Sequence, residues 1–211
     1  MRRRLQEAAI DALLARAPAA RPLIDDVVEL AKVSRGTFYR YYESVDELLD
    51  ELSKQMVDDT LQSFEPMFDQ LDDPAARAAG GPLLSLLRAA MQPRRVAIST
   101  RIDMLDYLER SSVQGSTIVM RCLDDGRASG VLAFDSLGAA LDFAIGATRE
   151  GVRRVAREGP GDGVYIREVT RMVLTGLGMS LPTADRAITD AWLHFNAKSK
   201  HVPWWRPVTP P

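Results

Sequence analysis

A basic and aromatic stretch around residue 40 carries the side chains best suited to chemistry in this sequence. Arg35, Thr37, Tyr39, Arg40 and Tyr41 lie close together, and no acidic residue separates them. Arginine can donate two hydrogen bonds to a guanine edge or hold a phosphate, and tyrosine and threonine hydroxyls can reach phosphate oxygens. The stretch therefore predicts a surface that contacts DNA. The alternative is a packing helix whose aromatic side chains form a half-buried cluster.

Two short helices joined by a tight turn would position these side chains. Apolar residues at helical spacing predict a first helix, with Ile24, Val27, Val28 and Ala31 on one face. The turn follows at Lys32 and Val33, and Ser34 is a suitable N-cap for a second helix over residues 35–42. Phe38 is expected to anchor that helix against Val28 and Ala31. Gly36 would leave room for another backbone or a groove.

The segment SRGTFYRYYESVDELLDEL, Ser34 to Leu52, resembles the helix-turn-helix of TetR-family transcriptional regulators. The match covers about the first quarter of the chain. In that family the second motif helix enters the major groove of DNA. The resemblance therefore implies DNA contacts by Ser34, Arg35, Gly36, Thr37, Tyr39, Arg40 and Tyr41.

Three residues depart from the family pattern. Leu23 replaces the usual Ser or Thr before the first motif helix, Lys32 replaces the turn glycine, and Val45 replaces a lysine. If Lys32 needs a positive φ, that conformation costs about 1 kcal/mol for a residue other than glycine. A phosphate contact by Lys32 would offset this cost. Arg3 and Arg4, in a basic arm at the start of the chain, could also contact DNA, or the arm could simply be solvated.

The bulk composition limits what kind of DNA-binding protein this could be. The chain has 211 residues, 46% of them hydrophobic, and a formal net charge of −2. DNA binding must therefore come from a local basic patch. The single cysteine, Cys122, excludes an internal disulfide and fits a cytoplasmic protein. No stretch is apolar for long enough to span a membrane, and charged residues interrupt the signal-like start.

Hydrophobic periodicity predicts an all-α fold: a three-helix helix-turn-helix head joined to a helical bundle that dimerises. We expect a DNA-binding domain over residues 1–45 and a ligand-binding and dimerisation domain over 46–211. Predicted helices cover about 3–16, 46–71, 83–91, 93–108, 115–129, 137–157, 164–180 and 183–196. The aspartates before Pro74 suggest a turn. Trp204 and Trp205 should dock on the bundle, because leaving two indoles exposed is costly.

The bundle has two expected roles. Met and aromatic residues can line a deformable cavity for a small, largely apolar effector; the candidates are Phe64, Phe68, Met91, Met104, Tyr107, Met120 and Phe143. The two long C-terminal helices resemble those that form the four-helix dimer interface of the TetR family. The corresponding candidates are Leu141, Ile145, Thr148, Val152, Val169, Met172, Val173 and Gly176. For both sets the alternative is ordinary intramolecular core.

No catalytic constellation, metal site or cofactor-binding motif is evident. The two histidines, His194 and His201, lack a paired carboxylate pattern, and with one cysteine they do not suggest a zinc site. The predicted partners are a palindromic double-stranded DNA operator, a small effector and a second copy of the chain, without a membrane. The rival hypothesis is a helical protein-binding adaptor of the same fold that does not bind DNA.

Overall fold

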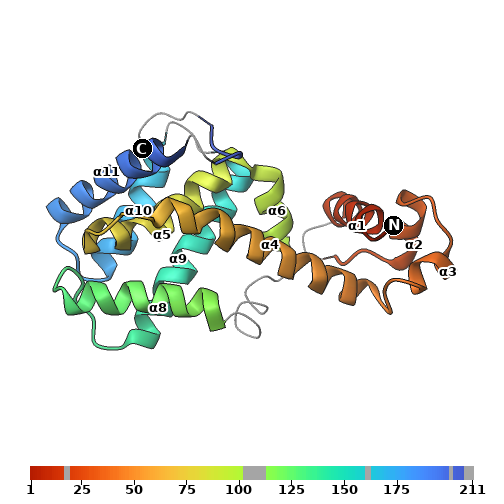
Figure 1. Ribbon diagram of the computed structural model, residues 1–211, viewed down its shortest axis with the longest axis horizontal. Helices are drawn as coiled ribbons and strands as arrows, with labels where there is room; N and C mark the ends of the chain where they lie inside the picture. The colour runs from red at the N-terminus through yellow and green to blue at the C-terminus, as the bar shows by residue number, and fades with distance from the viewer. Residues whose placement is uncertain (17–19, 102–112, 160–162, 200–201, 207–211) are drawn as a thin grey trace. The chain divides into compact units, whose positions relative to one another are not determined.

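The computed structural model describes residues 1–16, 20–101, 113–159, 163–199 and 202–206, and these residues form helices and no strand (Figure 1). The predicted all-α fold is thus confirmed. The helices, in chain order, are α1 (Arg2–Ala15), α2 (Ile24–Leu30), α3 (Arg35–Tyr39), α4 (Val45–Phe68), α5 (Pro74–Met91), α6 (Pro93–Arg101), α8 (Val113–Ala128), α9 (Leu137–Glu158), α10 (Val164–Gly176) and α11 (Leu181–Lys198).

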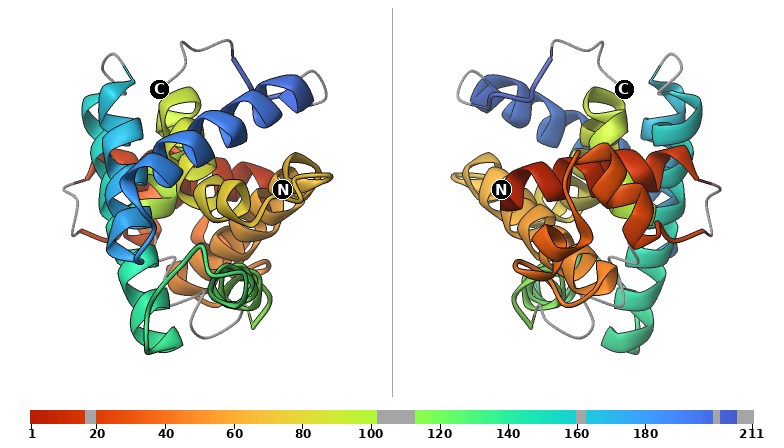
Figure 2. Two further views of the ribbon diagram at one scale, coloured as in Figure 1. Left: turned by 90° about the vertical axis from the view of Figure 1, so that its left-hand side faces the viewer. Right: turned by 90° about the vertical axis from the view of Figure 1, so that its right-hand side faces the viewer.

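The chain divides into two compact units, and the boundary after Thr60 falls within α4. The N-terminal unit contains Met1–Thr60 and the described residues of Ile98–Ser111. Its core is formed mainly by apolar side chains of α1 to α4, whose ribbons are seen in Figure 2, right. The largest fully buried side chains of this core are Leu5, Phe38, Tyr42 and Leu48. Arg2, Arg3 and Arg4 lie in the first turn of α1, so the basic arm is part of the helix that was predicted from about residue 3. The buried stripe of α1 starts at Leu5, and this packing extends the helix to the start of the chain.

The C-terminal unit contains Leu61–Ala97 and the described residues after Ser112. Helix α5 lies at its centre and contacts α8, α9, α10 and α11 (Figures 1 and 2). One long face of α5 is fully buried, including Leu83, Leu84, Leu86 and Leu87. A helix with so many partners must be apolar over most of its surface, and the sequence of α5 meets that requirement.

Helix α5 begins at Pro74, whereas the sequence analysis expected its helix only after Pro82. The side chain of Asp73 caps it, accepting a hydrogen bond from the amide of Ala76 at 2.9 Å. Proline is tolerated at the first position of a helix because its missing N–H would have no partner there. Gly80 lies within the helix, where packing leaves no room for a side chain. A Cβ at this position would come within 2.6 Å of the Phe68 ring and 3.0 Å of the Phe195 ring. Tertiary packing therefore explains why a glycine stands inside this helix.

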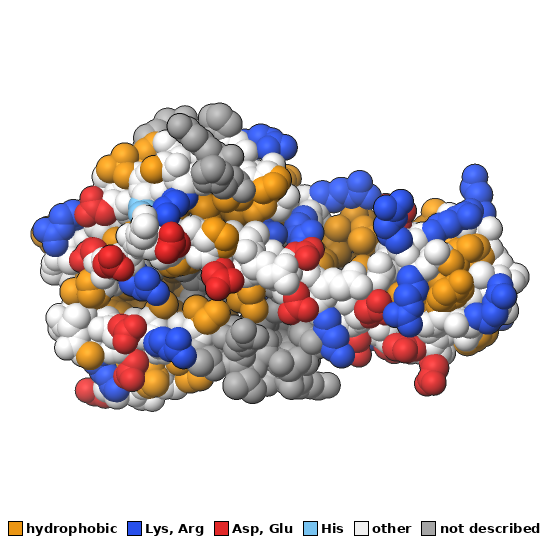
Figure 3. All heavy atoms as spheres, viewed as in Figure 1, with side chains coloured by type: hydrophobic (Ala, Val, Ile, Leu, Met, Phe, Trp, Pro, Cys, Tyr) orange, Lys and Arg blue, Asp and Glu red, His pale blue; other side chains and the backbone are white. Residues whose placement is uncertain are grey.

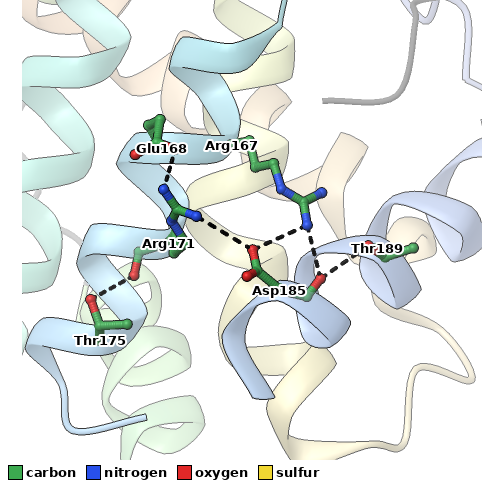
Figure 4. A network of polar contacts seen from close by, with 6 residues as sticks. All are labelled: Arg167, Glu168, Arg171, Thr175, Asp185 and Thr189. Carbon is green, nitrogen blue, oxygen red and sulfur yellow. Dashed lines mark hydrogen bonds and ion pairs between the residues drawn. The ribbon is translucent and has the colours of Figure 1, made fainter. Parts of the chain in front are cut away.

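Ion pairs hold α10 against α11 (Figure 4). Arg167 donates to the carboxylate of Asp185 at 3.1 Å, and Arg171 pairs with Glu168 on its own helix. Arg171 also lies 3.9 Å from the same Asp185 oxygen. These side chains are only partly buried, so the pairs orient α11 more than they stabilise the fold.

Helices α9 and α10 approach closely at two glycines. A Cβ at Gly151 would come within 2.9 Å of Val169, and one at Gly176 within 2.5 Å of the Phe143 ring. Gly178, in contrast, lies after α10, which ends at Gly176; its expected place inside a helix is wrong. Its φ of +87° terminates the helix, and a Cβ there would lie 2.4 Å from the carbonyl oxygen of Ala133.

We expect Gly178→Ala to destabilise the protein strongly. An alanine would face both the left-handed backbone penalty of about 1–2 kcal/mol and a collision with the Ala133 backbone, which cannot rotate away. Gly130→Ala is the matched control, because Gly130 has a φ of +75° but no described atom within 4 Å of a Cβ. Urea denaturation should show a larger loss of unfolding free energy for Gly178→Ala than for Gly130→Ala. Equal losses would contradict the steric explanation.

Residues 202–206 dock on their own unit, as predicted for the two tryptophans. Trp204 and Trp205 are both buried, and the Trp204 ring centroid lies 6.3 Å from that of Phe64. The guanidinium of Arg88, itself buried, lies 5.2 Å from the centroid of the Trp204 ring. Residues 202–206 thus complete the hydrophobic core of the C-terminal unit beside α4 and α5.

Candidate DNA-binding surface

Helix α3 is held by a single buried anchor. Phe38 is fully buried in the same cluster as Val28 and Ala31, as expected, and its ring lies 5.9 Å from that of Tyr42. The helix ends at Tyr39, three residues earlier than predicted. Tyr42 lies four residues after Phe38, and its amide still donates to the Phe38 carbonyl at 3.1 Å, so both side chains face the core of the unit.

The rest of α3 faces solvent. Arg35, Gly36, Tyr39 and Arg40 are exposed, Tyr39 to 58%, while Thr37 and Tyr41 are half-buried. A Cβ at Gly36 would meet only the Ser34 hydroxyl, at 3.8 Å, among the described atoms. Nothing described within the chain therefore requires a glycine here. Figure 3 shows Lys and Arg side chains around exposed hydrophobic ones on the visible face of the N-terminal unit.

Hydrogen bonds order the hydroxyl groups on this face. Ser34 caps α3, as predicted, by accepting from the Thr37 amide at 3.1 Å. The Thr37 hydroxyl lies 3.0 Å from that of Ser34 and accepts from Arg40 Nη2 at 3.4 Å. Three of the predicted DNA-contacting residues, Ser34, Thr37 and Arg40, are thus brought together in one polar row.

Arg35 is paired with Asp25 of α2, a partner that the sequence analysis missed. Arg35 Nε donates to Asp25 Oδ1 at 2.7 Å, and Arg35 Nη2 donates to Asp25 Oδ2. The hydrogen bonds from Arg35 lower the pKa of the Asp25 carboxyl below its usual value. The ten-residue separation crosses the turn, so helical spacing alone gave no signal for the pair.

The departures from the family pattern have local consequences. Leu23 is the N-cap of α2 and provides no side-chain cap, but Asp26 Oδ2 accepts from the Leu23 amide at 2.7 Å. Ser44 accepts from the Glu47 amide at 3.0 Å at the start of α4. Arg2 donates to Glu51 at 2.8 Å, whereas Arg3 and Arg4 remain exposed.

Lys32 has a φ of +51°, so the turn does adopt the left-handed conformation that favours glycine. We expect Lys32→Gly to raise the free energy of unfolding by up to about 1 kcal/mol, because glycine adopts this conformation without a Cβ penalty. Lys32→Ala, which removes the charge but keeps the Cβ, is the control. Urea denaturation of both variants checks this, and a Lys32→Gly variant no more stable than Lys32→Ala would contradict it.

The predicted pocket residues do not all gather in one place. Phe64, Phe68 and Met91 are half-buried against the core of the C-terminal unit. Met120 is half-buried on α8, and Phe143 is 45% exposed on α9. Met104 and Tyr107 lie outside the described residues. A hollow of about 300 Å³ does occur in this unit, but Asp72, Pro74, Arg77, Cys122 and Asp125 line it.

The predicted interface residues lie along α9 and α10. Val173 is buried in the core, Met172 is 66% exposed, and Leu141, Val152 and Val169 are half-buried against the core. Ile145 and Thr148 are half-buried, and Gly176 is exposed. Gly146 has no described atom within 4 Å of a Cβ. Some of the apolar side chains on α9 and α10 are therefore buried, while others, including Phe143 and Met172, form an exposed apolar strip.

The residues that the structure describes contain no group of three or more His, Cys, Asp or Glu side chains arranged to hold a metal ion. None of the helices within them has the length and apolar character that crossing a membrane requires.

Solved structures of one protein, RolR, resemble this chain over most of its length. One is without ligand and one is in complex with resorcinol. The free structure matches with a TM-score of 0.56 and 18% sequence identity, over 88% of this chain and 95% of RolR. The resorcinol complex matches with a TM-score of 0.64 and 19% identity, over 99% of this chain and 94% of RolR. No protein-family model and no curated protein sequence matches the chain. At this identity the likeness shows a shared all-α fold.

Proposed function

We propose that the chain is a ligand-responsive, DNA-binding transcriptional regulator of the TetR family, and that it acts as a repressor. It binds a palindromic operator as a dimer, and a small-molecule effector releases it. The observation that carries the proposal is the exposed face of α3. Arg35, Tyr39 and Arg40 point to solvent there, on a helix that Phe38 anchors to the unit. Residues 1–45 bind DNA, and residues 46–211 bind the effector and dimerise.

The charges and hydroxyls on this face support contact with a nucleic acid. A surface helix that only faces water is usually rich in Glu, Lys and Gln, whereas α3 has the sequence RGTFY. The Ser34 and Thr37 hydroxyls and the Arg40 guanidinium lie in one hydrogen-bonded row. Such groups bind phosphate oxygens and so fix a protein on the duplex. The open space beside Gly36 allows close approach of a DNA backbone.

The exposed strip on α9 and α10 supports a dimer. Two short recognition helices related by a two-fold axis read a palindrome, whereas one reads few bases. Phe143 and Met172 are exposed here, and Gly146 has open space around it. Two copies that pack this strip against its equivalent would bury these side chains. Gly146 would permit the helices to come close together.

The likeness to RolR supports an effector-binding role for the C-terminal unit. RolR was crystallised with resorcinol, a small aromatic molecule, and shares the fold over nearly all of this chain. We propose a small, largely apolar effector here too, bound beside aromatic side chains such as Phe64 and Phe68. Its effect on DNA binding must come from different affinities for two arrangements of the dimer.

Selection of bound duplexes from a random DNA pool at near-physiological salt tests this function. We expect an enriched palindrome, whose half-site spacing reports the dimer. Affinity for that palindrome should fall linearly with salt on a log–log plot, since phosphate contacts release counterions. If folded, dimeric protein enriches no sequence, the rival protein-binding adaptor is favoured. Mass spectrometry of the same sample would reveal a co-purified effector that holds the protein off DNA.

A further inference from the structure

The ion pair between Arg35 and Asp25 lies on the proposed DNA-contacting surface. A contribution to the stability of the fold does not explain it. The Arg35 and Asp25 side chains are 62% and 61% exposed. Ion pairs this exposed contribute little to stability, because water screens them and ordering two side chains costs entropy. The two hydrogen bonds form a side-on fork in which both carboxylate oxygens accept. A fork of this kind fixes the direction of the guanidinium plane.

The fork occupies only one edge of the guanidinium. Arginine has five N–H donors in one plane. Asp25 accepts from Nε and from one hydrogen of Nη2. The end edge, formed by Nη1 and the other hydrogen of Nη2, remains for another acceptor pair. Guanine presents such a pair, O6 and N7, in the major groove.

Charge also favours a base edge over a phosphate as the binding partner of Arg35. The carboxylate of Asp25 offsets the charge of Arg35 and repels a nearby phosphate, while a base edge carries no formal charge. Asp26, the neighbouring acid, accepts instead from Arg16 and from the Leu23 amide. Arg40 donates to a hydroxyl, not a carboxylate, in its described contact. Arg40 is therefore suited to phosphate, and Arg35 to a base.

We propose that Asp25 is a specificity-determining residue, which holds Arg35 side-on so that the free end of its guanidinium reads one guanine in each half-site. This inference rests on the proposed DNA-binding function. Asp25 acts as a positioning residue, since Arg35 makes the contact. The carboxylate lowers the conformational entropy that Arg35 loses on binding, and it disfavours the swing of Arg35 to a phosphate.

The test compares selected DNA sequences and salt dependence for the wild type, Arg35→Ala, Asp25→Ala and a charge-matched control, Asp50→Ala, an exposed acid on α4. In the wild type we expect one guanine per half-site whose replacement lowers affinity roughly 5- to 150-fold, the range of a bidentate contact. Arg35→Ala should abolish that preference. Asp25→Ala should reduce it to a few-fold or less, leave preferences at other positions unchanged, and raise affinity for non-specific DNA.

The salt dependence adds a readout that a purely structural role for Asp25 would not change. If the freed Arg35 moves to a phosphate, the log–log salt slope should steepen by about 0.9 for each phosphate gained. Asp50→Ala should change neither the guanine preference nor the slope. Circular dichroism checks folding, and Asp25→Asn replaces Asp25→Ala if the latter is misfolded.

The outcomes distinguish this inference from the function on which it rests. An enriched palindrome with an Arg35-dependent guanine that Asp25→Ala leaves intact overturns the role of Asp25 alone. An equal loss of preference at every position also overturns it, since that indicates general damage to the surface. If the wild type enriches no sequence, the DNA-binding proposal itself fails, and the inference fails with it.

Discussion

Arg35→Ala and Tyr39→Ala are each expected to weaken operator binding severely while leaving the dimer intact. Both side chains are exposed on α3, and Tyr39 has 58% of its surface open to solvent. A dimer carries two copies of each contact, so every loss counts twice in the binding free energy. For Arg35, the factor of roughly 5- to 150-fold for one bidentate contact becomes about 25-fold to more than 10,000-fold for two.

Gel shifts on the selected palindrome measure this effect, and sedimentation of the same samples reports the dimer. Arg186→Ala is the matched control, because Arg186 is exposed on α11 of the C-terminal unit. Its operator affinity should equal that of the wild type. Unchanged binding by Arg35→Ala and Tyr39→Ala would refute the proposed interface and favour the adaptor.

Met172→Arg is expected to separate the dimer into folded monomers. Met172 is 66% exposed in the single chain, so the substitution should leave the fold of one chain undisturbed. In the proposed interface the same position becomes buried, and an unpaired buried charge costs several kcal/mol. The dimer dissociation constant should therefore rise by about 1,000-fold. Operator affinity should fall with it, since one recognition helix reads few bases.

Light scattering across a dilution series checks the assembly, and circular dichroism checks the fold. Leu193→Arg provides the comparison: Leu193 is 54% exposed on α11, away from the proposed strip in sequence, and its replacement should keep the dimer. A Met172→Arg protein that stays dimeric would place the interface elsewhere. A wild-type protein that is monomeric at operator-binding concentrations would remove the dimer from the proposal.

Most of the helices and the local details of the motif could be predicted from the sequence. Ser34 as the cap of α3, Ser44 as the cap of α4 and a strained φ at Lys32 each depend on residues three or four apart, or on one backbone angle. Phe38 as the anchor follows from helical periodicity, which places one side chain of a short helix on the core. Such features are encoded by neighbours along the chain, so a local pattern is sufficient to find them.

Only the tertiary structure decided the features that depend on distant residues. Asp25 meets Arg35 because the turn folds α3 back against α2. The angle between these two helices cannot be deduced from the residue spacing within either one. Gly80 stands inside α5 because the rings of Phe68 and Phe195 occupy the space that a Cβ would need. The rings of Phe64 and Trp204 lie together although the sequence places them at opposite ends of the C-terminal unit.

The same reason explains why the exposed polar face of α3 was easier to predict than a pocket in the bundle. The face is formed by neighbouring residues of α3 and by Arg40 and Tyr41 directly after it, so their types and order determine its chemistry. A pocket in the C-terminal unit would be built by helices far apart in sequence. Their packing places Phe143 on the exterior while Phe68 packs against the ring of Phe195.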